Sequence, residues 1–97
     1  YEAILQLRPA NKILMDYVFK QIGKRDNVSV AKIVELKTGI DIYLSDKNFT
    51  KSLGKKLKKA FKGKLTLSKA LYSRDRQTSK SLFRHTILFR LSQGPEQ

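Results

Sequence analysis

Residues 40–61 read Ile-Asp-Ile-Tyr-Leu-Ser-Asp-Lys-Asn-Phe-Thr-Lys-Ser-Leu-Gly-Lys-Lys-Leu-Lys-Lys-Ala-Phe, and they contain a strand followed by a helix. The alternation over residues 40–44 predicts a strand with one apolar face. Ser45 or Asp46 is expected to cap the helix, because each offers a side-chain oxygen to its first free N–H groups. Apolar residues then recur at helical spacing, which predicts an amphipathic helix that ends near Phe61.

This predicted helix is divided into an apolar side and a lysine side. Six lysines occupy most of the polar side: Lys51, Lys55, Lys56, Lys58, Lys59 and Lys62. Like charges stacked on one helix repel each other and lower its stability. A phosphate backbone would relieve that repulsion and release counterions. Nucleic acid is therefore the favoured partner, and a solvated face, an anionic membrane surface or an acidic protein are the alternatives.

Working outward, alternating apolar and polar residues predict four more strands, at residues 1–8, 30–36, 65–73 and 82–91. A further helix is predicted over residues 10–22, opened by Pro9. Its apolar stripe consists of Ile13, Leu14, Tyr17, Val18 and Ile22. The order β-α-β-β-α-β-β predicts an α+β fold, a two-layer sandwich with a mostly antiparallel sheet of about five strands. Both helices would cover one face and leave the other partly open.

The hairpin formed by residues 30–36 and 40–44 has a predictable register. A three-residue loop, with a left-handed Gly39 in a bulge, pairs Leu36 with Ile40 and keeps both apolar sets on one face. This register places Glu35 opposite Asp41. Paired carboxylates can bind Mg²⁺ or share a proton, which would suit a nuclease. The large excess of cations favours the other interpretation, in which a neighbouring Lys or Arg neutralises each carboxylate.

Length and composition exclude several classes of protein. The chain has 97 residues, enough for one domain, and we expect residues 1–92 to form that domain within a longer protein and residues 93–97 to be a linker or tail. It has no cysteine and one histidine, which excludes a disulfide framework and a thiolate zinc site. No apolar run approaches the roughly 20 residues of a membrane span. Nothing in the sequence forms an active site or predicts a metal or cofactor.

Charge is the most informative part of the composition. The chain holds 21 basic and 8 acidic residues, for a net charge of +13. Residues 1–48 contain eight basic and six acidic side chains, whereas residues 49–97 contain thirteen basic and two acidic ones. A domain this basic is suited to a polyanion, and the second half of the chain is expected to contact it.

Other cations extend the predicted binding surface. The polar loop between the last two strands carries Arg74, Arg76 and Lys80, which are side chains suited to phosphate. Arg84 and Arg90 are predicted on the open sheet face, beside Tyr43 and Tyr72. Arginine and tyrosine can stack on unpaired bases, although ordinary cross-strand packing is the favoured interpretation there. His85 lies in an apolar strand pattern, which favours a buried, hydrogen-bonded structural role.

Three stretches together carry a family resemblance. They are Tyr1-Glu2-Ala3-Ile4-Leu5-Gln6-Leu7-Arg8, Gly39-Ile40-Asp41-Ile42-Tyr43-Leu44, and Phe83-Arg84-His85-Thr86 followed by Arg90. In this order, around a basic helix, the chain resembles the central module of the NMD3 family, adapters of the large ribosomal subunit in late assembly and, in eukaryotes, in nuclear export. Members carry Cys-x-x-Cys zinc motifs in an N-terminal region, which this cysteine-free sequence would not include.

The resemblance implies a non-catalytic module of a ribosome assembly or export adapter. It implies large-subunit ribosomal RNA, and ribosomal proteins, as partners, and a cytoplasmic location with nuclear shuttling in a eukaryote. Combined with the residues above, it predicts RNA binding through the lysine-rich helix and the basic hairpin loop, by a protein that we expect to be monomeric. A binder of anionic membrane or of an acidic protein is the alternative.

Overall fold

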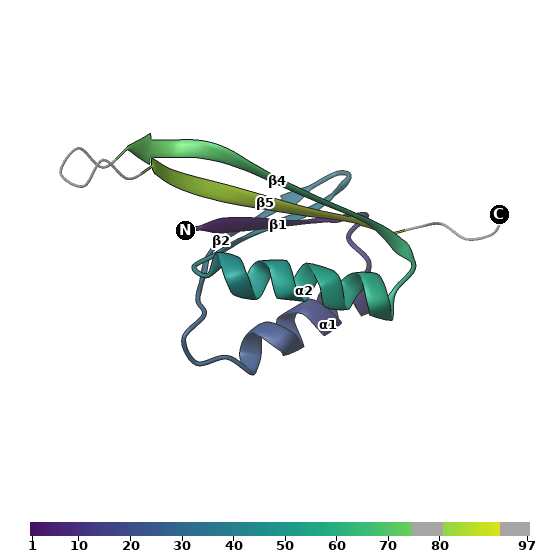
Figure 1. Ribbon diagram of the computed structural model, residues 1–97. Coiled ribbons are helices and arrows are strands. Elements are labelled where there is room, and N and C mark those ends of the chain that lie inside the picture. The colour runs from purple at the N-terminus through teal and green to yellow at the C-terminus, as the bar shows by residue number, and fades with distance from the viewer. Residues whose placement is uncertain (75–80, 92–97) are drawn as a thin grey trace.

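The computed structural model describes residues 1–74 and 81–91, and their side chains except those of residues 71–74, 81 and 82. Five strands and two helices form two layers, with both helices on one face of the sheet (Figure 1). The elements in chain order are β1 (Ala3–Arg8), α1 (Lys12–Gly23), β2 (Val30–Leu36), β3 (Gly39–Leu44), α2 (Lys47–Ala60), β4 (Gly63–Arg74) and β5 (Ser81–Leu91). The predicted α+β sandwich is confirmed.

The sheet has the strand order β2-β3-β1-β5-β4. β1 is central, antiparallel to β3 and parallel to β5, so that Leu5 lies between Ile42 and Ile87. The remaining pairs are antiparallel, which makes the sheet mostly antiparallel, as predicted. Because β1 is paired on both edges and covered on one face, its three inward residues, Ala3, Leu5 and Leu7, are completely buried.

Helix α1 begins two residues later than predicted. Asn11 is its N-cap, and the Asn11 side chain accepts hydrogen bonds from the backbone N–H groups of Ile13 and Leu14. Leu14, Val18 and Ile22, spaced four residues apart, face the sheet and are buried. Ile13 was predicted in that stripe, but its side chain is 69% exposed. It lies one residue before the inward row, where the helix turns it to solvent.

The predicted register of the β2–β3 hairpin is wrong by one residue. A two-residue turn, Lys37-Thr38, pairs Leu36 with Gly39 and Val34 with Asp41. β2 is an edge strand with most of its side chains exposed. β1 and the core bury the inward residues of β3, so apolar pairing with β2 does not determine the register.

Gly39 is also not left-handed, because no glycine among the described residues has a positive φ. Its role is a close approach between strands. A Cβ atom at Gly39 would collide with the backbone carbonyl of Leu7 and with the Arg8 side chain. The glycine therefore allows β3 to pair closely with the end of β1, which a turn-based reading of the sequence does not reveal.

The β4–β5 hairpin is longer than the rest of the sheet. β1 pairs with β5 only from His85 to Arg90, whereas β4 pairs with β5 as far as Ser81. Residues 81–84 of β5 therefore have a strand neighbour on one side only, and this end of the hairpin extends past β1 and past the start of α2 (Figure 1).

Candidate nucleic-acid interface

Helix α2 is held at its start by a cap that the sequence predicted. The Asp46 carboxylate accepts a hydrogen bond from the backbone N–H of Phe49 at 2.9 Å. The Thr50 hydroxyl, which is completely buried, donates to the Asp46 carbonyl at 2.7 Å. Phe49, Leu53 and Leu57 are buried against the sheet. The cap and these three apolar residues together fix which side of α2 points away from the core.

Gly54 allows α2 to lie close to the sheet. The sequence presents this glycine as a weak point, because glycine costs roughly 1 kcal/mol against alanine in a helix. In the structure Gly54 is buried, and a Cβ atom there would lie 2.8 Å from Ile87 Cγ2 and 3.0 Å from Leu65 Cδ1. The missing side chain is therefore the reason that α2 can pack on β4 and β5.

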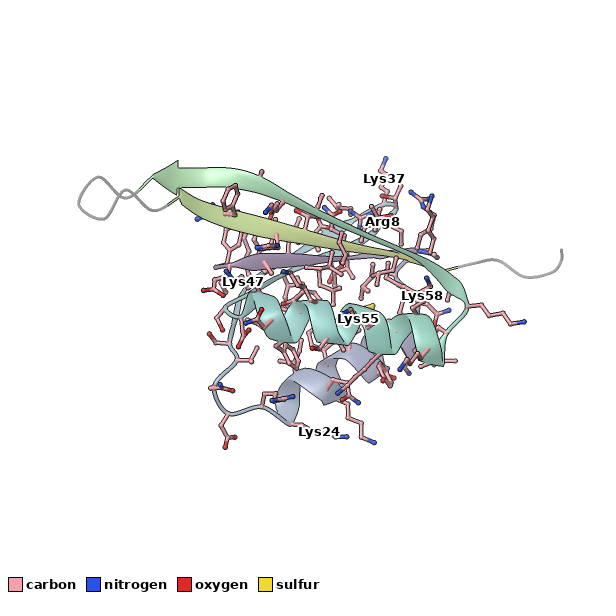
Figure 2. The ribbon with its side chains drawn as sticks, viewed as in Figure 1. Arg8, Lys24, Lys37, Lys47, Lys55 and Lys58 are labelled. Atoms are coloured by element: carbon pink, nitrogen blue, oxygen red, sulfur yellow. The ribbon has the colours of Figure 1, made fainter. Side chains whose placement is uncertain are left out.

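Most of the predicted lysines of α2 lie on the side of the helix opposite its buried residues, and Lys55 and Lys58 are labelled on the helix in Figure 2. Lys51 is half-buried and the other five are exposed. One side of α2 carries most of these lysines, and Lys62 follows the helix. We call this surface the lysine face, and it consists of Lys51, Lys55, Lys58, Lys59 and Lys62. Lys62 lies two residues after the last residue of α2 rather than on it. Lys56 lies about two turns after Phe49 and therefore on the flank beside the buried side.

The lysine face has no acidic counterpart among the described residues. The ion pair found among the described residues is between Arg8 and Asp41, and it lies on the opposite side of the sheet. Helix α2 has no acidic residue in its first turn and two lysines in its last. The lysine charges therefore remain uncompensated by the part of the protein that the structure describes, as the sequence argument required.

The positive surface extends beyond the predicted lysines toward β5. His85 is half-buried rather than fully buried, and its side chain makes no hydrogen bond to a described residue. Burial lowers the pKa of its imidazole, and nearby ammonium groups lower it further; in decreasing order they belong to Lys51, Lys47 and Lys69. Lys47 was not among the predicted site residues, although its place four residues before Lys51 puts it on the same side of α2.

The open sheet face uses its cations differently. The rings of Tyr1 and Tyr43 meet edge to face, with centroids 4.7 Å apart. The Arg84 guanidinium lies 3.9 Å from the centre of the Tyr1 ring and donates to the Tyr1 hydroxyl at 3.0 Å. Lys32 lies 5.7 Å from the centre of the Tyr43 ring. These rings and cations contact one another, which agrees with the cross-strand packing that the sequence favoured at this face.

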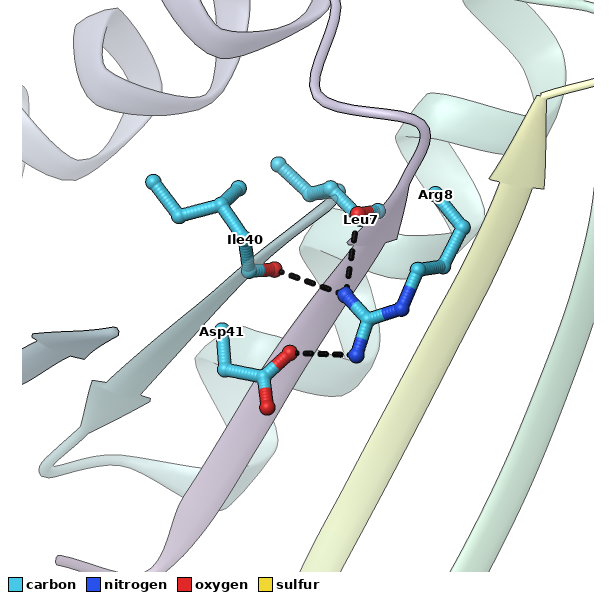
Figure 3. A network of polar contacts seen from close by, with 4 residues as sticks. All are labelled: Leu7, Arg8, Ile40 and Asp41. Atoms are coloured by element: carbon cyan, nitrogen blue, oxygen red, sulfur yellow. Dashed lines mark hydrogen bonds and ion pairs between the residues drawn. The ribbon is translucent and has the colours of Figure 1, made fainter. Parts of the chain in front are cut away.

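Asp41 is neutralised on the same open face. Its carboxylate accepts a hydrogen bond from Arg8 Nη2 at 2.7 Å, and Arg8 Nη1 donates to the carbonyls of Leu7 and Ile40 (Figure 3). The two charged side chains are only 15% and 13% exposed. Glu35 lies opposite Ile40 instead of Asp41, so the predicted carboxylate pair is absent and the nuclease interpretation loses its metal site.

Several predicted site residues are placed only in part. Arg90 is exposed on β5, opposite Lys64 of β4 and next to Arg8 of β1. Arg74 ends β4, and its side chain, like that of Tyr72, lies outside the description. Arg76 and Lys80 lie outside the described residues. The contribution of the basic loop to the surface therefore stays a prediction.

Fold and surface define the class of this chain: a small basic α+β domain with an uncompensated row of lysines on one helix. Residues 1–91 match the family model described as the second domain of NMD3, and the chain belongs to the NMD3 family. This is a family of ribosome assembly and export adapters that work with the large ribosomal subunit. No curated protein matches the chain closely enough to be reported as a relative. In the described part of the chain, neither helix has the length and apolar character needed to cross a bilayer.

Proposed function

We propose that this domain is a non-catalytic RNA-binding module of a large-subunit assembly or export adapter, and that its lysine face binds ribosomal RNA. The observation that best supports this proposal is the alignment of exposed lysines on one side of a helix whose opposite side is buried in the core. Lysine recognises the phosphate backbone and supplies affinity without base specificity. Such a surface would orient the adapter on folded RNA and leave sequence recognition to other contacts.

The membrane alternative has less support from the structure. A helix that binds in a lipid interface buries its apolar side among the acyl chains. Here Phe49, Leu53 and Leu57 are already buried beneath α2, so the helix would have to leave the sheet. An acidic protein surface remains the competing partner, because it too would be attracted by the lysines.

Salt dependence of RNA binding tests the proposal. If the domain neutralises about six phosphates, a plot of log K against log salt for duplex RNA should have a slope of about −5. Replacing Lys55, Lys58 and Lys59 by Gln should make that slope shallower by about 2 to 3. A flat salt response, or tight binding to acidic vesicles without RNA binding, contradicts the proposal.

A control variant with the same change in charge is available on and just after α1. Lys12 and Lys20 of α1 and Lys24, the residue after its end, are exposed, and replacing all three by Gln lowers the net charge by the same amount. If the lysine face is the binding surface, this control should keep most of the original slope. Equal losses in the two triple variants would mean that only the total charge matters, and the site assignment would be wrong.

The remaining predicted residues fall into two groups. Lys56, Arg74, Arg76 and Lys80 would add phosphate contacts beside the lysine face, whereas Arg84 and Arg90 lie on the open sheet face and would contact RNA only from that other side of the domain. Because Arg84 already contacts Tyr1, its replacement by Gln should weaken RNA binding less than a lysine-face replacement does. We further propose that the domain acts as a monomer in the cytoplasm, with nuclear shuttling in a eukaryote.

A further inference from the structure

The helix-side surface of the projecting β4–β5 hairpin exposes an aromatic ring. Phe83 belongs to the part of β5 that extends beyond β1. Strand alternation places it on the same face as Ile87 and Phe89, which are buried under the helices. Because Phe83 lies beyond that cover, its side chain is 39% exposed. Leu67 of β4 is 49% exposed on the same face.

One ammonium group lies over this ring, and two more lie near the neighbouring His85. The Lys69 ammonium lies 4.8 Å from the centre of the Phe83 ring. Lys47 and Lys51 project from the start of α2, close enough to His85 to act on its charge, as does Lys69. The acidic group that faces the same histidine is Glu2, and its carboxylate accepts the backbone N–H of Lys47 at 3.0 Å. The cluster therefore combines one exposed ring with three ammonium groups and one carboxylate engaged at the helix start.

We propose that this cluster is a second RNA contact, in which Phe83 stacks on an unpaired base while Lys47, Lys51 and Lys69 bind the phosphates beside it. The inference rests on the proposed function and extends it from duplex backbone to a junction between paired and unpaired RNA. Lys51 belongs to both surfaces, so one RNA strand can run from the lysine face onto the hairpin. The ring selects an unpaired base because bases in an A-form helix are stacked and its major groove is too narrow for side chains.

Two RNA probes separate this contact from the lysine face. One is a blunt duplex, and the other is the same duplex with a short single-stranded 3′ extension containing 2-aminopurine. The original domain should bind the extended RNA more tightly and change the 2-aminopurine fluorescence. Phe83→Leu should remove that advantage, a loss of about 5- to 160-fold on the extended probe, and leave blunt-duplex binding unchanged. Phe83→Tyr should keep the advantage.

Proton linkage provides an independent measurement. Burial and the three lysines lower the pKa of His85 and so favour its neutral form, against the opposing charge of Glu2. A phosphate bound among those lysines would favour the protonated imidazole. Binding of the extended probe should therefore tighten as the pH falls from 7.5 to 5.5, and His85→Gln should lose this tightening. Thermal unfolding of each variant checks that it is folded.

The outcomes distinguish the two proposals. If the blunt duplex shows the steep salt slope but the extension adds no affinity, the second contact is wrong and the lysine-face proposal stands. If Phe83→Leu weakens both probes equally, the ring does not read an unpaired base and the inference also fails. If neither probe binds, both proposals fail, and an acidic protein partner becomes the preferred interpretation of the surface.

Discussion

The open face of the sheet and the lysine face of α2 treat positive charge in opposite ways. On the open face, Arg8 is paired with Asp41, and Arg84 and Lys32 lie over tyrosine rings. On the helix face, the lysines of α2 have no acidic partner among the described residues. A net charge of +13 therefore does not locate a binding surface by itself. The informative quantity is the charge that the protein's own side chains leave unmatched.

This contrast has a consequence for stability and binding. A cation that is paired within the fold contributes to stability. Its removal leaves the partner group partly buried and without its counter-charge. An unmatched cation on a crowded helix contributes repulsion. Replacements on the open face should therefore affect folding first, whereas replacements on the lysine face should affect RNA binding and leave folding intact.

The largest expected effect concerns the ion pair of the open face. Arg8→Ala removes three hydrogen bonds and leaves Asp41, only 13% exposed, without its partner. Loss of one member of a buried pair costs about 3–5 kcal/mol, and the residual exposure of this pair places the expected loss of stability at about 3 kcal/mol. Chemical denaturation should show it. Glu35→Gln, an exposed carboxylate on the neighbouring edge strand, is the control and should change stability by less than about 0.5 kcal/mol.

A smaller effect is expected beneath the lysine face. Gly54→Ala gains roughly 1 kcal/mol of helix propensity, but its methyl group would lie 2.8 Å from Ile87 and 3.0 Å from Leu65. Overpacking typically costs about 1–3 kcal/mol, so a net destabilisation of about 1 kcal/mol is expected in thermal or chemical unfolding.

The control for this substitution lies at the end of α1. Nothing lies within 4 Å of the corresponding Cβ position at Gly23, and its φ is not positive. Gly23→Ala should therefore stabilise the domain by about 0.4–1 kcal/mol. If both alanine variants were stabilising, the sheet beneath α2 would have room to adjust, and Gly54 would not be what sets the distance between the layers.

The division of α2 was predictable because it depends on local spacing. The cap, predicted at Ser45 or Asp46 and found at Asp46, the buried residues Phe49, Leu53 and Leu57, and the lysines on the other side all follow from one helical repeat. The overall fold class was predictable for the same reason, because each strand and helix has its own pattern of apolar and polar residues. Even the ends of the elements lie within about two residues of their predicted positions.

What could not be predicted depends on contacts between distant segments. The register of the hairpin is set at Gly39, which packs against Leu7 of a strand that is 32 residues earlier in the chain. Asp41 finds its cation in Arg8 on that same strand. The exposure of Phe83 depends on where β1 stops pairing with β5. None of these contacts leaves a periodic signal in the sequence.

On the lysine face, a still smaller effect is expected on stability. Replacing Lys55, Lys58 and Lys59 by Gln relieves like-charge repulsion on one helix, which is worth about 0.2–0.5 kcal/mol for each pair. It also removes the favourable interaction of Lys58 and Lys59, in the last turn, with the negative end of the helix dipole. The triple variant should therefore stay within about 1 kcal/mol of the stability of the original domain, while its RNA binding falls. A marked loss of stability would show that these lysines support the fold, and the contrast between the two faces would no longer hold.

The smallest effect is expected from His85, and its sign follows from its environment. Burial, and then Lys51, Lys47 and Lys69, hold its pKa below 6.5 in the folded domain, so the unfolded chain binds this proton more readily. The free energy of unfolding should therefore fall as the pH drops below about 6.5 toward the folded-state pKa, and should not depend on this group above about pH 7.5. His85→Gln should remove that slope between pH 5.5 and 7.5. Salt screens the lysine contribution but not the burial, so in 1 M salt the slope should shrink without vanishing. A slope that is insensitive to salt would mean that the three lysines lie too far from His85 to act on a phosphate beside it.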